Sequence, residues 1–182
     1  MVQKKQQPLS FAPYCRELTE PIVYKRGHAK PLSDLLKDEG AKADANVIPQ
    51  DPVIDVDALA TDTPQADKLS SVDTLFCCAN NLIQLVECKY RVGGRKKDRK
   101  SLTPPTKSEL EKKVRGTKQL LSDEDLGAGF APALVLLFSD RHIEQARAWV
   151  NDYNAGKKTP LYKEMTTADF LDTFFTPKQH SP

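Results

Sequence analysis

The chain has little of what marks a secreted or membrane protein. Its 182 residues include only four cysteines and three histidines, none of them in a CxxC pair or in the paired spacing of a metal site. No apolar run approaches the roughly 20 residues that cross a bilayer, and no apolar stretch of a signal peptide follows the N-terminal segment MVQKKQQPLS. These absences exclude a disulfide scaffold and a membrane-spanning protein, and they predict a soluble intracellular protein of the cytoplasm or nucleus.

The composition is that of an ordinary globular protein. Charged residues make up 29% of the chain and hydrophobic residues 39%, and the length suffices for one well-buried domain with appended segments. Three of the cysteines, Cys77, Cys78 and Cys88, stand inside apolar runs, where a thiol behaves as a small hydrophobic side chain. We therefore predict reduced core cysteines. The histidines stand far apart, and we assign them no chemistry.

The net charge is only +2, but the charges are unevenly distributed. From Lys89 to Lys118 there are twelve Lys or Arg residues and three acids, whereas from Pro31 to Phe76 there are ten acids and three lysines. Such a basic segment is typical of a protein that binds a polyanion, because contacts with phosphates release counterions. The alternative is a solvated surface helix and loop, which charged stretches usually form.

The first 70 residues predict little regular structure. Residues 10–19 can form a short helix, and a second can run over 31–39, since it starts with a proline, which suits the first helical turn, and Gly40 suits the position just past the end. Residues 41–70 are rich in Ala, Asp and Pro, and VIDV at 53–56 is their only strand-like fragment. We expect a long, partly mobile surface excursion there.

From residue 71 onward the pattern is that of an α/β protein. VDTLFCCA at 72–79 and LIQLVECKY at 82–90 are apolar, β-prone runs around Asn80 and Asn81, and they predict a β-hairpin. The later elements follow from a capping box, a continuous apolar run and two apolar helical stripes. They are a helix at 106–121, a buried strand at 132–138, a helix from about 139 to 152 and a last helix at 167–175. This order predicts an α/β layered core.

Two charged residues end the second strand of this hairpin. Glu87 and Lys89 are two residues apart, so both side chains leave the same face of the sheet. Both are costly to place at the end of an apolar run unless something compensates them, as a metal ion and a phosphate would. Asp73 lies directly across from Glu87 if the turn has the three residues 79–81, and on the other face if it has two. The predicted site therefore requires an odd turn or a bulge.

These residues, in this order, resemble the PD-(D/E)xK nuclease superfamily. The resemblance covers about residues 70–152: Asp73, then Glu87-Cys88-Lys89 at the end of the second strand, then a helix and a buried strand. It implies a restriction-endonuclease-like core, with a central mixed sheet, flanking helices and a β-hairpin that carries the active site. It also implies a phosphodiesterase that depends on Mg²⁺ or Mn²⁺. Val72 stands where the family name has proline, a common departure.

The resemblance also implies roles for the residues. Asp73 and Glu87 would hold one or two metal ions, which prefer oxygen ligands, and the backbone carbonyl of Cys88 could supply a further ligand. Lys89 would orient or help deprotonate the attacking water and stabilise charge on the phosphate. Family members sometimes add an acid from the first helix and a polar residue from the helix after the lysine. The places to look are Glu17, Glu20, Lys118 and Gln119.

The pattern acid-x-Lys occurs at two further places, so the tripeptide alone identifies nothing. Asp98 to Lys100 lies in a charged loop, and we expect Glu111 to Lys113 on a charged helix face. Only Glu87 and Lys89 end an apolar strand with an acid in the partner strand. The alternative for this pair is a cross-strand ion pair or a solvated strand end.

Two functions are compatible with these observations. The first is a metal-dependent nuclease that hydrolyses DNA phosphodiester bonds, in restriction, repair, recombination or defence against mobile elements. The basic residues expected to reach the DNA phosphates are Arg91, Arg95, Lys96, Lys97, Arg99, Lys100 and Lys118. The second is a catalytically inactive nuclease-like domain that binds nucleic acid or a protein. Exposed phenylalanines of the last helix would then form the partner surface, in a homodimer or with another protein.

The domain organisation follows the same patterns. We expect an N-terminal helical and irregular segment over 1–70, a nuclease-like α/β core over 71–153, and a C-terminal helix and tail over 154–182 that pack on the core or extend from it. No internal repeat is visible, and no DNA-reading motif such as a helix-turn-helix or a zinc finger is present. The sequence therefore names no preferred substrate sequence.

Overall fold

One mixed, open sheet of seven strands organises the part of the chain that the structure describes. The structure is a computed structural model, and it describes residues 28–42, 48–63, 69–78, 82–90, 103–122 and 128–175. The strands are β1 (Ala29–Pro31), β2 (Pro52–Asp55), β3 (Thr74–Cys78), β4 (Leu82–Cys88), β5 (Gly129–Phe130), β6 (Leu134–Phe138) and β7 (Tyr162–Thr166). In the same residues the α-helices are α2 (Leu32–Asp38), α3 (Val56–Asp62), α4 (Lys107–Leu120), α5 (Ile143–Asn154) and α6 (Thr167–Phe174).

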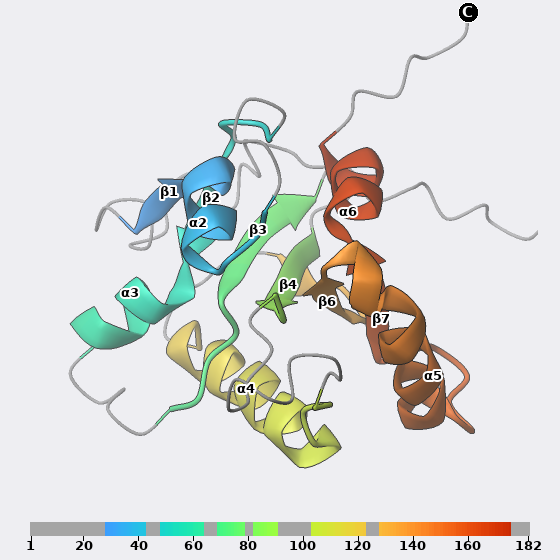
Figure 1. Ribbon diagram of the computed structural model, residues 1–182. Coiled ribbons are helices and arrows are strands. Elements are labelled where there is room, and N and C mark those ends of the chain that lie inside the picture. Colours follow the sequence, from blue (N-terminus) through green and yellow to red (C-terminus); the bar gives the residue numbers. More distant parts are fainter. Residues whose placement is uncertain are drawn as a thin grey trace, which may run out of the picture.

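The strand order across the sheet is β1-β2-β3-β4-β6-β7, and the short β5 pairs with β4 (Figure 1). Strands β1 to β4 are antiparallel neighbours, whereas β4, β6 and β7 run parallel. Parallel neighbours need a crossover connection, and α4 precedes β6 as α5 precedes β7. The parallel strands therefore end at one edge of the sheet, which is the edge where Glu87 lies.

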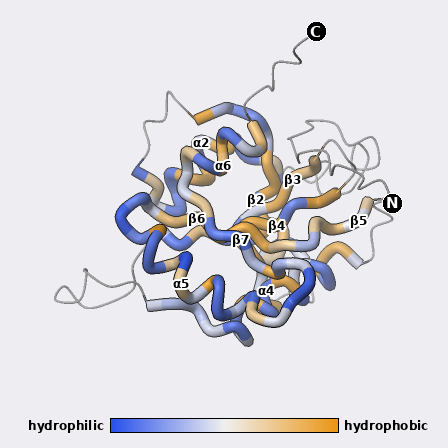
Figure 2. The backbone as a smooth tube through the Cα atoms, turned by 90° about the vertical axis from the view of Figure 1, so that its right-hand side faces the viewer, coloured by the Kyte–Doolittle hydropathy of each residue, from blue (hydrophilic) through white to orange (hydrophobic). Residues whose placement is uncertain are grey.

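Helices cover both faces of the sheet. Figures 1 and 2 show α4 and α5 on one side of the strands and α2 and α6 on the other. Side chains of β3 and β4 alternate between the two faces, as the period of two in a strand requires. Leu75, Cys77, Ile83 and Leu85 pack toward α3, α4 and α5, and Phe76, Cys78, Val86 and Cys88 pack toward α2 and α6. The apolar runs of the hairpin are thus buried on both sides.

The predicted elements from residue 71 onward are confirmed. The hairpin of β3 and β4 is antiparallel, and all of β6 is buried between β4 and β7. Helix α4 starts at the predicted capping box, in which Thr106 and Glu109 bond each other's backbone N–H groups. The short helix α2 also lies where expected, and Gly40 just past its end has φ 94, a left-handed conformation that favours glycine. The sequence prediction of an α/β core is therefore correct.

The predicted surface excursion over residues 41–70 is wrong for residues 48–63. Strand β2 joins the sheet between β1 and β3, and α3 follows it. The N-cap of α3 is Asp55, whose side chain accepts a hydrogen bond from the Ala58 N–H at 3.0 Å. Val53, Ile54, Val56 and Leu59 are buried. The fragment VIDV was noted as strand-like, but these short apolar groups stand between acidic residues, so the local composition predicted an excursion where tertiary packing stabilises a strand and a helix.

The expected exposed phenylalanines of the last helix are not exposed. Phe170 and Phe174 are buried against Phe76 of β3, with ring centroids 5.9 and 5.3 Å from the Phe76 ring. Phe175, partly buried, lies 5.3 Å from the same ring. The physical reason is that α6 packs its apolar stripe on the sheet, so these rings form core and leave no aromatic surface for a partner.

The sheet also extends beyond the core predicted for residues 71–153. Strands β1 and β2 precede that range and β7 follows it. Strand β7 was missed because its sequence, YKEMT, is largely polar and only Tyr162 and Met165 are buried. None of the helices in the described part of the chain combines the length and apolarity that a membrane-crossing segment needs.

Candidate active site

The register of the hairpin brings the two predicted acids together. Thr74 pairs with Val86 and Cys78 with Leu82, so the connection between the strands is the three-residue segment 79–81. One position beyond the last pair, Asp73 stands across from Glu87 on the same face of the sheet. The Asp73 Oδ2 atom accepts a hydrogen bond from the Cys88 N–H at 2.5 Å. The predicted condition of an odd turn is confirmed.

Helices α3 and α4 hold Asp73 from either side. The Val56 N–H at the start of α3 donates to the Asp73 carbonyl at 3.2 Å, and the Val72 N–H donates to Thr117 Oγ1 of α4 at 2.9 Å. Gly116 lets α4 come this close, because a Cβ atom there would stand 2.0 Å from the Ser70 carbonyl oxygen. The segment before β3 is therefore clamped against α4.

Lys113 of α4 completes the site. Its Nζ atom lies 2.8 Å from Oε1 and 2.9 Å from Oε2 of Glu87, and 3.7 Å from Oδ1 of Asp73. Lys89 also bonds Glu87 through Oε1. The Glu87 side chain is 1% exposed and that of Asp73 11%, whereas the two lysines are about a quarter exposed. Glu87 thus contacts the ammonium groups of both lysines, and Asp73 shares that of Lys113.

The electrostatics of Asp73 reflect this crowding. Burial, and after it the charge of Glu87, raises the pKa of Asp73 from 3.8 to about 7, although Lys113 and the Cys88 N–H act in the opposite direction. For Lys113, burial works against the ammonium, but Glu87 and Asp73 outweigh it and its pKa is raised. Two neighbouring carboxylates with little access to solvent therefore need a cation to stay ionised.

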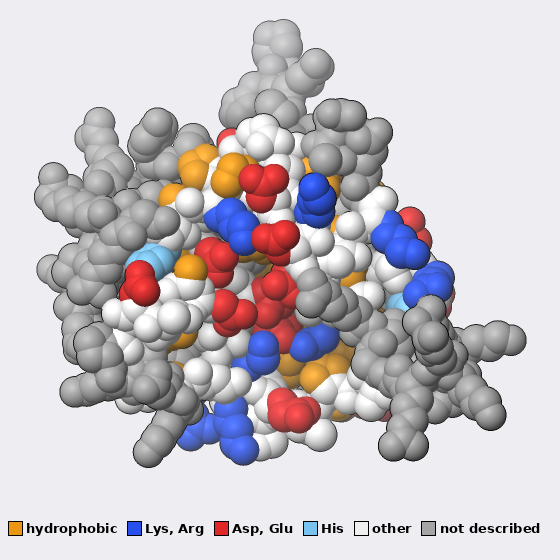
Figure 3. All heavy atoms as spheres, turned by 60° about the vertical axis from the view of Figure 1, so that its left-hand side comes forward, with side chains coloured by type: hydrophobic (Ala, Val, Ile, Leu, Met, Phe, Trp, Pro, Cys, Tyr) orange, Lys and Arg blue, Asp and Glu red, His pale blue; other side chains and the backbone are white. Residues whose placement is uncertain are grey.

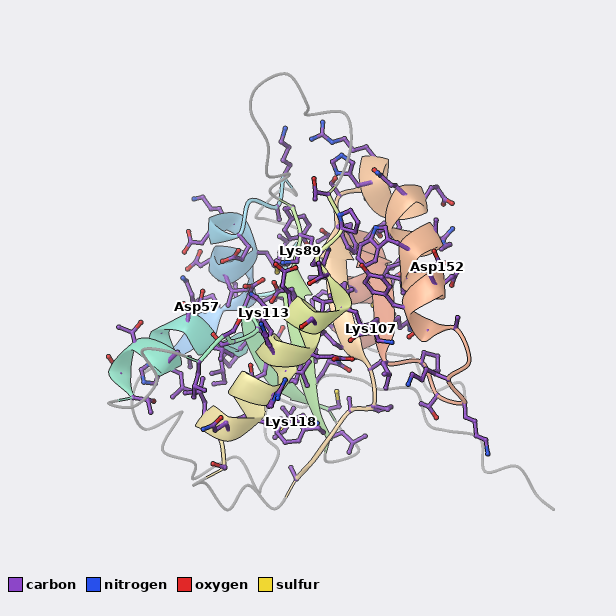
Figure 4. All side chains as sticks on the ribbon, turned by 90° about the horizontal axis from the view of Figure 1, so that it is seen from below. Asp57, Lys89, Lys107, Lys113, Lys118 and Asp152 are labelled. Atoms are coloured by element: carbon purple, nitrogen blue, oxygen red, sulfur yellow. The ribbon has the colours of Figure 1, made fainter. Side chains whose placement is uncertain are left out.

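The surroundings of the carboxylates are charged on the surface and apolar beneath. On the face in Figure 3, acidic side chains gather near the centre, with Lys and Arg side chains above and below them. In Figure 4, Lys113 projects from α4 toward the end of β4, where Lys89 lies. Asp57 of α3 is near Lys113 in the same view. Asp57 contributes to the raised pKa of Lys113. The site thus lies where the acidic and the basic segments of the sequence meet.

The donor set suits a hard divalent cation in part. Asp73 and Glu87 provide carboxylate oxygens, which Mg²⁺ and Mn²⁺ prefer. The Cys88 side chain packs on the opposite face, and burial raises the pKa of its thiol, so only its backbone carbonyl can contribute. Within the described residues no group of three or more His, Cys, Asp or Glu side chains is placed to hold a metal. A cation here would complete its shell with water and substrate oxygens, as Mg²⁺ usually does.

The remaining predicted site residues are not brought to the carboxylates. Lys118 lies over the Phe130 ring, 4.8 Å from its centroid, on another side of α4. Gln119 is exposed near the end of that helix. The other predicted residues lie outside the described residues: Glu17, Glu20, Arg91, Arg95, Lys96, Lys97, Arg99 and Lys100.

Lys113 was missed by the sequence analysis, which expected Glu111 to Lys113 on a charged helix face. The signal was available: Leu110, Lys113 and Thr117 recur at intervals of three and four, so they share the inner stripe of α4 with Val114. A lysine on an apolar inner stripe needs a buried partner. Glu87 is that partner.

Comparison of the chain with protein-family models, curated protein sequences and solved structures finds no match. The function is therefore argued from the geometry and chemistry of this site.

Proposed function

We propose that this protein is a metal-dependent nuclease that hydrolyses DNA phosphodiester bonds with a PD-(D/E)xK-like site. The observation that carries the proposal is the position of Asp73 directly across from Glu87, with Lys89 on the same face and hydrogen-bonded to Glu87. The order of elements around it also supports the proposal: an antiparallel hairpin, then a helix, then a buried parallel strand. A purely structural ion pair would need neither a second buried acid nor a second lysine.

Each residue has a role in this proposal. Asp73 and Glu87 would hold Mg²⁺ or Mn²⁺ with the Cys88 carbonyl, and the bound ion would polarise the phosphoryl group and lower the pKa of a bound water. The Cys88 N–H keeps the Asp73 carboxylate oriented. Lys89, about a quarter exposed, orients the attacking water and stabilises charge that develops on the phosphate.

The basic surface of α4 fits a polyanionic substrate. Lys107, Arg115 and Lys118 all lie on this one helix, which borders the site. The predicted basic loop that precedes α4 lies outside the described residues. Phosphate contacts by such a surface would make DNA binding depend strongly on salt, at a slope of about 0.9 per contact.

The direct test is cleavage of plasmid and linear DNA with and without Mg²⁺ or Mn²⁺. We expect the parent to cut only with the divalent cation and Glu87→Gln to lose the activity, because the amide removes one negative ligand. Glu111→Gln, an exposed substitution on α4, is the matched control and should cut at the parental rate. A parent that cuts with no divalent cation, or a Glu87→Gln protein that still cuts, would refute the proposed site.

Lys89 separates catalysis from simple ion pairing. Lys89→Ala should lose roughly 10²- to 10³-fold in rate, the worth of one group that stabilises transition-state charge, with little change in metal or DNA affinity. Lys112→Ala, on the exposed side of α4, is the control. If Lys89→Ala melts at a lower temperature yet cuts at the parental rate, Lys89 is only a partner of Glu87.

A second candidate function is an inactive nuclease-like domain that binds nucleic acid. Two observations favour it: ammonium groups already compensate Glu87, and the described residues offer only two carboxylates to a metal. In that case the parent would bind DNA, would not cut it with any divalent cation, and would bind no Mn²⁺ at Asp73 and Glu87. The cleavage and metal-titration experiments therefore distinguish the two functions.

A further inference from the structure

Lys113 occupies an unusual position for a lysine of a surface helix. Its ammonium lies within hydrogen-bonding distance of both Glu87 oxygens and 3.7 Å from Asp73 Oδ1, so it lies between the two carboxylates that the proposed function assigns to the metal. Lys89 bonds Glu87 alone. Of the two lysines, Lys113 is therefore the one that fills the space the two acids share.

The charges of the four side chains balance without a metal. With both acids ionised, two carboxylates and two ammonium groups sum to zero, and each acid has a cationic partner. Adding a divalent cation while both lysines stay would leave an excess of positive charge in a place where Glu87 is almost fully buried. Charges of one sign this close in a poorly solvated place repel strongly. The ammonium that touches both acids is the one that must move.

The structure also allows the movement. The Lys113 side chain is 26% exposed, and a lysine has a flexible stem of four carbons whose charged end can turn to water. The backbone of α4 stays in place, because Gly116 and Thr117 hold it against Ser70 and Val72. The side chain can thus leave the carboxylates without any displacement of the helix.

We propose that Lys113 is a built-in stand-in for the divalent cation: its ammonium occupies the space between Asp73 and Glu87 in the metal-free protein, leaves that space when the cation binds, and then faces the substrate phosphate. This inference rests on the proposed function, since it assumes that the two acids are metal ligands. It assigns to Lys113 a positioning role distinct from that of Lys89. It also means that the protein's own side chain competes with the metal.

Competition between Lys113 and the metal predicts that removing the lysine raises the affinity for the metal. Lys113→Met should bind Mn²⁺ more tightly than the parent, by roughly tenfold to a hundredfold, the range for one or two charge-assisted hydrogen bonds that no longer need to be broken. A merely structural lysine would give the opposite result, because its loss would distort the site. Titration calorimetry at about pH 8.5, well above the ordinary pKa of carboxyl groups, avoids competition from protons. Lys112→Met is the matched control and should bind like the parent.

A second measurement uses the parent protein and depends on no substitution. Amine acetylation mapped by mass spectrometry should find Lys113 protected in chelator and reactive in Mn²⁺, with Lys112 equally reactive in both. Lys113→Gln serves as the variant if Lys113→Met does not fold.

The outcomes separate the two proposals. Tighter Mn²⁺ binding by the variant and metal-dependent exposure of Lys113 support the stand-in. If the parent binds Mn²⁺ but the Lys113 variant binds it equally or more weakly, or if Lys113 reactivity does not change, the stand-in is overturned and the nuclease proposal remains. If neither the parent nor the variants bind Mn²⁺, both proposals fail.

Discussion

Strands β3 and β4 present different kinds of side chain on the two faces of the sheet. On the face that packs against α2 and α6, β3 and β4 present Phe76, Cys78, Val86 and Cys88, and the contacts are aromatic and aliphatic. On the face that packs against α4, the same strands present apolar side chains along their length and then Asp73 and Glu87 at one end. At that end, α4 places Lys113 against the acids where an apolar residue would otherwise pack.

The difference shows where this fold can place charge. A buried carboxylate is stable only with a partner of opposite charge, and α4 provides one because its inner stripe reaches the end of the hairpin. The opposite face ends in a cluster of Phe76, Phe170, Phe174 and Phe175, whose rings pack against one another beneath α6. We expect stability to depend mainly on the aromatic face and chemistry on the charged one.

The largest effect should come from the aromatic face. Phe76 is fully buried and its ring meets three others at 5.3 to 5.9 Å, so Phe76→Ala should lower the free energy of unfolding by about 3–5 kcal/mol. Phe76→Leu, which keeps most of the volume, should cost less than about 1.5 kcal/mol. Urea unfolding measures both. If the folded Phe76→Ala protein also lost its metal affinity, the proposed division between the two faces would be wrong.

A smaller, pH-dependent effect should come from the charged face. With its pKa raised to about 7, Asp73 binds a proton more tightly in the folded than in the unfolded state, so the stability it contributes is complete below about pH 4 and is lost as the pH rises through about 7. Asn does not titrate. In chelator, Asp73→Asn should therefore gain on the parent from pH 4 to pH 7, by on the order of a few kcal/mol, and the difference should then level off. Unfolding curves at about pH 5 and 8 check this. Equal pH dependence of both proteins would contradict the burial of an ionisable Asp73.

The smallest of the three effects concerns the contact that aligns the charged face. Replacing glycine by alanine inside a helix usually stabilises it, but at Gly116 the new Cβ would meet the Ser70 carbonyl at 2.0 Å. Gly116→Ala should therefore cost about 1–3 kcal/mol and change the reactivity of Lys113 toward acetylation. Gly156→Ala is the control. Nothing lies within 4 Å of a Cβ atom added there, so only the positive φ of 74 is unfavourable for the alanine. A stabilised Gly116→Ala protein would show that the close contact does not exist.

Much of the fold and half of the site could be predicted from local patterns. Alternation and apolar runs predicted β3, β4 and β6, and the capping box at Thr106 predicted the start of α4. The even separation of Asp73 and Glu87 predicted their common face, given an odd turn. Strand β7 could not be predicted, because its polar residues outweigh the two that are buried. For β2 the sequence offered only the short strand-like fragment VIDV, and pairing with β3 is what makes it a strand.

The amino-acid sequence by itself determined which residues have to leave water and which local elements they form, since periodicity and capping act between near neighbours in the chain. It thereby determined that an acid and a lysine end a buried strand. Only the tertiary structure decided which cation those acids meet. Lys113 is 26 residues from Glu87 in the chain, and the approach of α4 to Ser70 and Val72 brings its ammonium to the carboxylates. Such a contact depends on packing between distant segments, which no local pattern encodes.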